Sequence, residues 1–106
     1  MDNMLSLDDK SSNEMQIHLA KQMKSLRLSK SLTLATLEDM TGVKSSSIKR
    51  FEAIGEVSLK SFLKLAEGLG VLQRFEGVLK PSDEPMTVDE LKSMLSRKKS
   101  RKRGSK

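Results

Sequence analysis

Residues 32–52, LTLATLEDMTGVKSSSIKRFE, contain the pattern that decides the fold. Thr33 can cap a short helix, and Gly42 can end that helix in a left-handed turn. The apolar residues of this helix recur every three positions, at Leu34, Leu37 and Met40. A second helix is predicted over 45–52, with Ile48 on its apolar side. Two short helices joined by a tight turn that contains glycine predict a helix-turn-helix arrangement.

Amphipathic helices are predicted on both sides of this pair. Upstream, Asn13 and Gln16 have the spacing of a capping box that opens a helix through about Ser29. Its apolar face is predicted at Leu19, Met23 and Leu26, with basic residues pointing elsewhere at Lys21, Lys24 and Arg27. Downstream, Ser58 can cap an apolar fourth helix that ends at 68–70, and residues 71–79 predict a fifth helix that stops before Pro81.

A short sixth helix is predicted after a polar linker. Thr87 and Glu90 form a second capping box, and an apolar stripe follows at Val88, Leu91, Met94 and Leu95. We therefore expect a flexible N-terminus over 1–12, a helix-turn-helix domain over 13–80, a linker with this helix over 81–96, and a disordered basic tail over 97–106. The expected fold class is all-α: a compact five-helix helix-turn-helix domain with a short sixth helix and the tail.

Composition supports a single small helical domain. The chain has 106 residues, of which 36% are hydrophobic and only 3% aromatic, and it contains no cysteine. No apolar run approaches the ~20 residues that span a bilayer. Acidic residues stand near the N-terminus where a signal peptide carries basic ones. We expect a soluble, cytoplasmic protein that does not bind a membrane.

Charge is distributed very unevenly along the chain. The net charge is +6, yet residues 1–96 carry 13 basic and 14 acidic side chains. The other seven basic residues lie in the last ten positions, which contain no acid: Arg97, Lys98, Lys99, Arg101, Lys102, Arg103 and Lys106. Such a block is predicted to contact a nucleic acid or another polyanionic partner, or only to aid solubility.

The chain resembles the Xre (Cro/CI-like) family of helix-turn-helix regulators over about 60 residues. The resemblance lies in the stretches 19–27, 32–37, 41–52, 58–66 and 69–71. It implies a lambda-repressor-like fold for the five-helix domain. Two residues depart from the family pattern. Glu38 stands where the family usually has a small residue between the two helices, and Lys44 stands where it usually has a Ser or Thr N-cap.

The resemblance implies a set of DNA contacts. A major groove about 12 Å wide admits one helix with short or flexible polar side chains. By resemblance Lys44, Ser45 and Ser46 face base edges, and Arg50 reaches a guanine or a phosphate. Backbone contacts are expected from Ser47, Lys49 and Thr33, the last at the start of its helix.

Within the Xre family, residues 51–61, 69–76 and the basic terminus resemble the HipB-like antitoxins. That resemblance implies a homodimer that represses its own operon at a palindromic operator and binds a HipA-like serine/threonine kinase toxin. Candidate dimer contacts are Leu72, Phe75, Val78 and Leu79. The alternatives are a free-standing Xre-type regulator, an RNA-associated adaptor that uses the tail, and an enzyme accessory subunit.

The sequence contains few residues that could form a catalytic or metal site. His18 is the single histidine, and no cysteine stands beside it as a second metal ligand. Glycines 68 and 70 lack the third glycine of a dinucleotide loop, and residues 42–45 lack the spacing of a phosphate-binding loop. We expect no enzyme activity, no metal and no cofactor.

Overall fold

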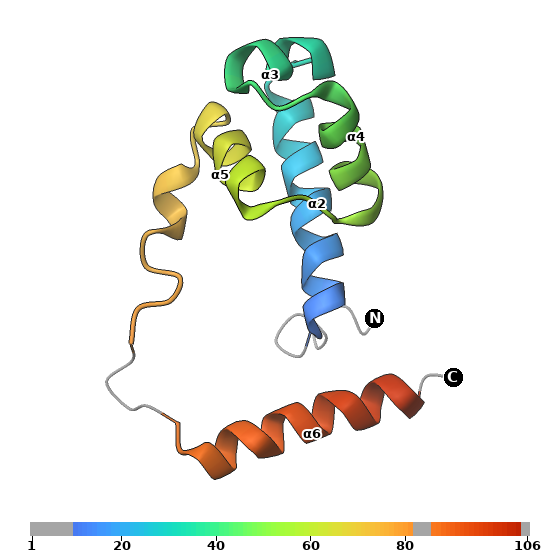
Figure 1. Cartoon of the computed structure of the whole chain (residues 1–106), viewed down its shortest axis with the longest axis vertical. Coiled ribbons are helices and arrows are strands. Elements are labelled where there is room, and N and C mark those ends of the chain that lie inside the picture. The colour runs from blue at the N-terminus through green and yellow to red at the C-terminus, as the bar shows by residue number, and fades with distance from the viewer. Residues whose placement is uncertain (1–9, 82–85, 105–106) are drawn as a thin grey trace. The chain divides into compact units, whose positions relative to one another are not determined.

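The fold is all-helical, as the sequence predicts (Figure 1). The computed structural model describes residues 10–81 and 86–104, and side chains within those ranges through Ser96. These residues form five α-helices and one 3-10 helix and contain no strand: α2 (Ser12–Ser29), α3 (Leu34–Thr41), α4 (Ser45–Ile54), α5 (Leu59–Gly68), η1 (Leu72–Phe75) and α6 (Val88–Gly104). Ser12–Val78 form one compact unit, and α6 belongs to another.

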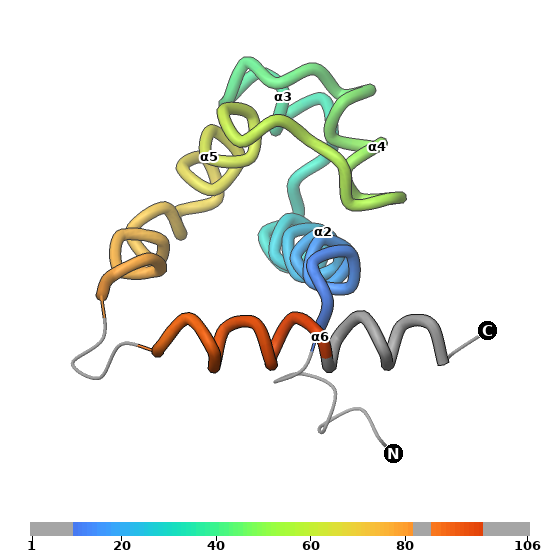
Figure 2. The backbone as a smooth tube through the Cα atoms, turned by 60° about the horizontal axis from the view of Figure 1, so that its bottom comes forward, coloured from blue at the N-terminus to red at the C-terminus, as the bar shows by residue number. Residues whose placement is uncertain are grey.

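The core of the Ser12–Val78 unit is formed by buried residues of α2, α3, α4 and α5, with α4 packed on α2 and α3 packed on α4 and α5. Figure 2 looks nearly along α2 and shows these three shorter helices around it. The largest fully buried side chains come from α3, α4, α5 and the turn after α5: Leu37, Ile48, Leu65 and Leu69. Complete burial of each stabilises the fold by about 1.5–3 kcal/mol. The apolar faces of α3 and α4 therefore hold these helices against the core and leave their polar faces exposed.

Helix α2 buries a different face from the one the sequence predicts. The residues it buries are Ala20, Met23 and Arg27. Of the predicted apolar face, Met23 is buried, whereas Leu19 and Leu26 are only half-buried. The prediction that Arg27 points away from the core is wrong, because Arg27 meets a carboxylate partner inside the fold. The predicted capping box is also wrong, since α2 begins at Ser12 and the Gln16 side chain donates instead to the Gly55 carbonyl, 3.0 Å away.

The predicted fifth helix is reduced to the single turn of η1. Gly70 adopts φ +78°, and the Val71 amide bonds the Ala66 carbonyl, which closes α5 and turns the chain. Residues after Phe75 form turns instead of continuing a helix. Gly77 disfavours a helix there, since glycine costs about 1 kcal/mol relative to alanine in a helix interior.

The second predicted capping box forms as expected. The Thr87 amide donates to Glu90 Oε1 at 2.8 Å, and the Glu90 amide donates to Thr87 Oγ1 at 3.1 Å. Helix α6 then continues through Gly104, past the predicted end of this helix at residue 96. Lys and Arg are good helix formers, so the basic sequence contains nothing that stops the helix. Most of the predicted N-terminal segment and part of the predicted linker fall on residues 1–9 and 82–85, outside the described residues.

Gly55 is required by the contact between the end of α4 and α2. It has φ +78°, and a Cβ atom there would lie 3.0 Å from both the backbone carbon and the oxygen of Gln16. Gly42 has a similar φ of +81° with nothing within 4 Å of such an atom. We expect Gly42→Ala to cost about 1–2 kcal/mol through the left-handed conformation alone.

Gly55→Ala should cost distinctly more, because the α2 backbone must also move. Urea unfolding followed by circular dichroism measures both variants. Equal losses would show that the close approach to Gln16 relaxes without cost.

Candidate nucleic-acid interface

Helices α3 and α4 are joined by a three-residue turn that fixes their relative placement. Gly42 takes the left-handed conformation, and its amide donates to the Glu38 carbonyl at 2.7 Å. Val43 is buried in the core, and its amide donates to Thr41 Oγ1 at 3.1 Å. The chain therefore leaves α3 and enters α4 with one apolar side chain anchored and Lys44 exposed.

The exposed part of α4 brings most of the predicted contact residues together. Ile48 and Phe51 are buried and hold the opposite face of the helix against the core. The residues that remain exposed at its start and along its outer side are Lys44, Ser46, Ser47, Lys49 and Arg50. This surface combines three cations with two short hydroxyl side chains, which is the chemistry that phosphates and base edges accept.

Thr33 is the N-cap of α3, as predicted. Its Oγ1 accepts from the Thr36 amide at 3.0 Å and also donates to Thr36 Oγ1 at 3.0 Å. A phosphate oxygen only accepts hydrogen bonds, so the predicted contact through this hydroxyl would have to take the proton that Thr33 donates to Thr36 Oγ1. The neighbouring amides of the first turn remain the simpler donors for an anion.

Glu38 caps α4 from the neighbouring helix. The N-cap residue Lys44 makes no side-chain capping bond. Instead Glu38 Oε1 accepts from the Ser45 amide at 2.9 Å and from the Ser45 hydroxyl at 2.7 Å. The two departures from the family pattern thus compensate for each other, because the long acidic side chain on α3 supplies the cap that Lys44 lacks. Ser45 is consequently half-buried, unlike Ser46 and Ser47.

The same contacts hold the pKa of Glu38 below its usual range. The Ser45 hydroxyl contributes most, followed by the Ser45 amide and the positive charge of Lys44, while partial desolvation acts in the opposite direction. A lowered pKa in the folded state stabilises the fold above the usual glutamate pKa of about 4.3. That contribution is lost as the pH falls through the lower, folded-state pKa.

We therefore expect Glu38→Gln to be less stable than the wild type at neutral pH and to converge with it as the pH falls below about 4. Urea unfolding across a pH series tests this, with Asp39→Asn, an exposed acid on the same helix, as the control. In the wild type, the Ser45 amide proton should titrate with Glu38 in two-dimensional NMR spectra. A stability difference that does not change with pH would contradict the assigned hydrogen bond.

Arg50 is held at the surface by an acidic neighbour. Its Nη2 lies 2.7 Å from Glu56 Oε1, and the two side chains are 64% and 57% exposed. Exposed ion pairs contribute little to stability, typically about 0–1 kcal/mol. In the absence of a ligand, Glu56 orients the Arg50 guanidinium. Because the ion pair contributes little, Arg50 can exchange Glu56 for a phosphate or a guanine at a small cost in free energy.

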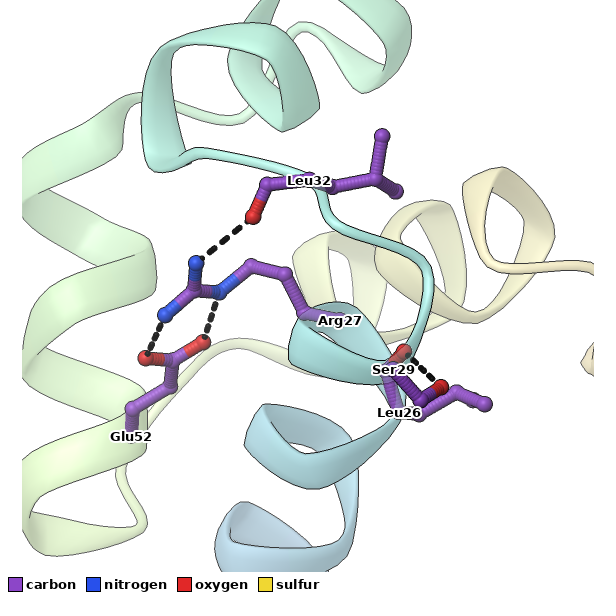
Figure 3. Close-up of polar contacts among 5 residues, drawn as sticks. All are labelled: Leu26, Arg27, Ser29, Leu32 and Glu52. Carbon is purple, nitrogen blue, oxygen red and sulfur yellow. Dashed lines mark hydrogen bonds and ion pairs between the residues drawn. The ribbon is translucent and has the colours of Figure 1, made fainter.

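Beneath this surface an ion pair that the sequence did not predict joins α2 to α4 (Figure 3). Arg27 Nε lies 2.7 Å from Glu52 Oε2, and Nη2 lies 2.9 Å from Oε1. Arg27 Nη1 donates to the Leu32 carbonyl at 2.8 Å, which also ties down the loop before α3. The side chains are 9% and 7% exposed. The helical spacing could have predicted the burial of Arg27, since it follows the buried residues Ala20 and Met23 at intervals of three and four positions.

The predicted dimer residues differ in exposure. Leu72 and Phe75 pack partly against the core, whereas Val78 and Leu79 are 61% and 92% exposed. A groove of about 720 Å³ separates α2 from η1, and its apolar lining includes Leu26, Phe62 and Phe75. The Phe62 and Phe75 rings meet edge to face, with centroids 5.3 Å apart.

The remaining predictions concern the tail, metals and membranes. The side chains of Arg97, Lys98, Lys99, Arg101, Lys102 and Arg103 lie outside the described residues. Among the described residues no group of His, Cys, Asp or Glu side chains could hold a metal ion. No helix in the same part of the chain is long and apolar enough to cross a membrane.

Comparison with known proteins finds no matching family model, no matching curated protein and no matching solved structure. Two features of the chain itself bear on its function. One is the pattern of residues 32–52. The other is the exposed cationic and hydroxyl side chains that α4 carries beside a short glycine turn.

Proposed function

We propose that this protein is a sequence-specific DNA-binding repressor in which α3 and α4 form a helix-turn-helix and α4 is the recognition helix. The observation that carries the proposal is the division of α4 into a buried and an exposed side. Ile48 and Phe51 fix the helix, while Lys44, Ser46 and Arg50 are exposed on a rigid element. Among the described residues, no buried side-chain polar atom lacks a hydrogen-bond partner.

The chemistry of the exposed side suits a duplex. A recognition helix reads base edges through side chains near its N-terminus and is positioned by contacts to phosphates. Ser46 is short enough to let α4 approach the bases, and Arg50 is long enough to form a bidentate contact with a guanine. Lys44 at the start of α4 can also reach a base edge, while Ser47 and Lys49 can contact the flanking backbone.

The proposed repressor is a homodimer. A single recognition helix buries too little surface for typical specific affinity, so two copies at an inverted repeat are expected, with half-sites about 10 base pairs apart or a multiple of that. The proposed contact is made by the exposed Val78 and Leu79 and by the partly buried Leu72 and Phe75. Of these residues, Phe75 also lines the groove between α2 and η1.

The resemblance to HipB-like antitoxins extends the proposal to the repressor of a toxin–antitoxin operon. On this proposal the chain binds a HipA-like serine/threonine kinase toxin and represses the promoter they share. The free-standing regulator is the alternative, and it requires no such partner. Co-purification with a kinase-like neighbouring gene product distinguishes the two.

Variants at two exposed α4 residues test the DNA-binding function. A selection from randomised duplexes with the full chain should yield an inverted repeat. We expect Arg50→Ala and Ser46→Ala each to weaken specific binding by about 1–3 kcal/mol and to relax preference at one base pair, with little loss of stability.

The matched control is Lys64→Ala, which removes one positive charge from an exposed position on α5. It should leave the base preference unchanged. Wild-type affinity and selectivity in both α4 variants would rule out α4 as the recognition helix.

A further inference from the structure

The hydroxyl of Ser45 has only acceptor capacity left for a ligand. Its Oγ lies 2.7 Å from Glu38 Oε1, and the adjacent amide lies 2.9 Å from the same oxygen. An ionised carboxylate only accepts hydrogen bonds, so the single hydroxyl proton of Ser45 points to Glu38. A hydroxyl has one proton and two acceptor lone pairs. Ser45 is half-buried, so those lone pairs can still meet a ligand at the start of α4.

Ser46 and Ser47 differ from Ser45 in this respect. Both are exposed, and their hydroxyls make no hydrogen bond within the described residues. A hydroxyl without a fixed partner rotates to donate or to accept as the ligand requires. Of the three successive serines, only Ser45 is restricted to accepting hydrogen bonds from a ligand. The residue that takes its proton, Glu38, lies on α3.

We propose that Glu38 sets the base preference of the recognition helix by holding Ser45 as an acceptor, so that Ser45 selects an amino base over a keto base. In the major groove adenine presents its N6 amine and cytosine its N4 amine, whereas guanine O6 and thymine O4 accept. Ser45 therefore accepts a hydrogen bond from adenine or cytosine on the strand it faces. Guanine or thymine would instead place an acceptor oxygen against the lone pairs of Ser45, which is unfavourable. Glu38 is a positioning residue and does not touch the DNA. This inference rests on the proposed function.

The test must separate the orientation of Ser45 from the capping of α4. Removing Glu38 alone also leaves the Ser45 amide uncapped, which can weaken the helix. A serine at position 44 can supply a local N-cap. We therefore compare Lys44→Ser with the double variant Glu38→Ala/Lys44→Ser, since both lack the same cation and both retain a cap. Circular dichroism confirms that the two variants are equally helical before DNA is added.

Duplex selection with the full chain gives the readout. The wild type and Lys44→Ser should each select adenine or cytosine over guanine or thymine at one position of each half-site, by about tenfold, the value of one hydrogen bond. The double variant should select amino and keto bases alike at that position and keep its other preferences. Ser45→Ala should lose the same preference, because it lacks the acceptor.

Three results would overturn the inference, and they are distinguishable. An amino-base preference that persists in the double variant shows that Glu38 does not set it. A specific motif from the wild type without any amino-base position shows that Ser45 does not read a base. Both leave the DNA-binding function standing. Selection of no motif at all by the wild type rejects the proposed function together with this inference.

Discussion

Glu52→Ala is expected to lower the free energy of unfolding by about 3–5 kcal/mol, a large part of the 5–15 kcal/mol typical of small domains. The substitution leaves the Arg27 guanidinium, whose side chain is 9% exposed, without the carboxylate that bonds two of its nitrogens. The remaining bond to the Leu32 carbonyl cannot compensate a buried charge. Because Arg27 joins α2, the loop before α3, and α4, the loss should also loosen the placement of α4.

The exposed ion pair of the same molecule is the matched control. Glu56→Ala breaks the pair with Arg50, whose side chain is 64% exposed, and should cost no more than about 1 kcal/mol. The double variant Arg27→Met/Glu52→Leu replaces both buried charges by apolar groups and should recover most of the loss. Urea unfolding of all three variants at one pH measures the comparison. Similar losses in Glu52→Ala and Glu56→Ala would contradict the structural role of the buried pair.

The buried pair should act over a wide pH range. The hydrogen bond to Glu52 is the main cause that raises the pKa of Arg27, and its charge adds to the effect against the cost of burial. A raised pKa stabilises the fold below the unfolded-state value and is lost only as the pH rises through the folded-state value. For a guanidinium both values lie above the physiological range, so this contribution does not change between neutral and moderately alkaline pH.

Local signals in the sequence were sufficient for the elements around the turn. Thr33 and Ser58 cap α3 and α5 through their side chains, and Gly42 ends α3 in a left-handed turn, as predicted. Each of these signals involves residues within one helical turn of each other, so the sequence displays them directly. The exposure of Lys44, Ser46 and Arg50 follows from the same periodicity, which buries Ile48 and Phe51.

The interactions that the sequence did not predict connect residues far apart in the chain. Arg27 and Glu52 are 25 positions apart, and Glu38 reaches Ser45 across the turn, seven positions on. An apolar periodicity predicts that a charged residue is exposed, because charged side chains are rarely buried without a partner. The partner of Arg27, Glu52, is distant in the chain, so the sequence places Arg27 on the wrong face of α2. The fifth helix was overpredicted for a related reason, since the apolar residues of 71–79 suited a helix while Gly77 and the turn at Gly70 opposed one.

Removing residues 97–106 is expected to flatten the salt dependence of DNA binding by roughly 3.6 units of log K per log unit of salt, if four of the seven basic residues there contact phosphates. Each neutralised phosphate on duplex DNA releases counterions worth ~0.9 unit. The affinity advantage of the full chain should then shrink by about a hundredfold between roughly 50 and 200 mM salt. Specific and random duplexes should be affected alike, because phosphate contacts do not read sequence.

The backbone of α6 is helical through Gly104, so a protein partner could recognise one face of its basic end. A shuffled tail can distinguish such recognition from simple charge neutralisation. A tail whose residues are shuffled keeps all seven charges, so the salt slope should remain that of the wild type if counterion release is the whole effect. A partner that recognises one face of α6 depends instead on the order of residues, and shuffling should then abolish co-purification with that partner. Fluorescence anisotropy titrations across a salt series for the full, truncated and shuffled chains separate these results. An unchanged slope on truncation would reject DNA contacts by residues 97–106, and co-purification with the full chain but not with the shuffled chain would then assign this segment to a protein partner.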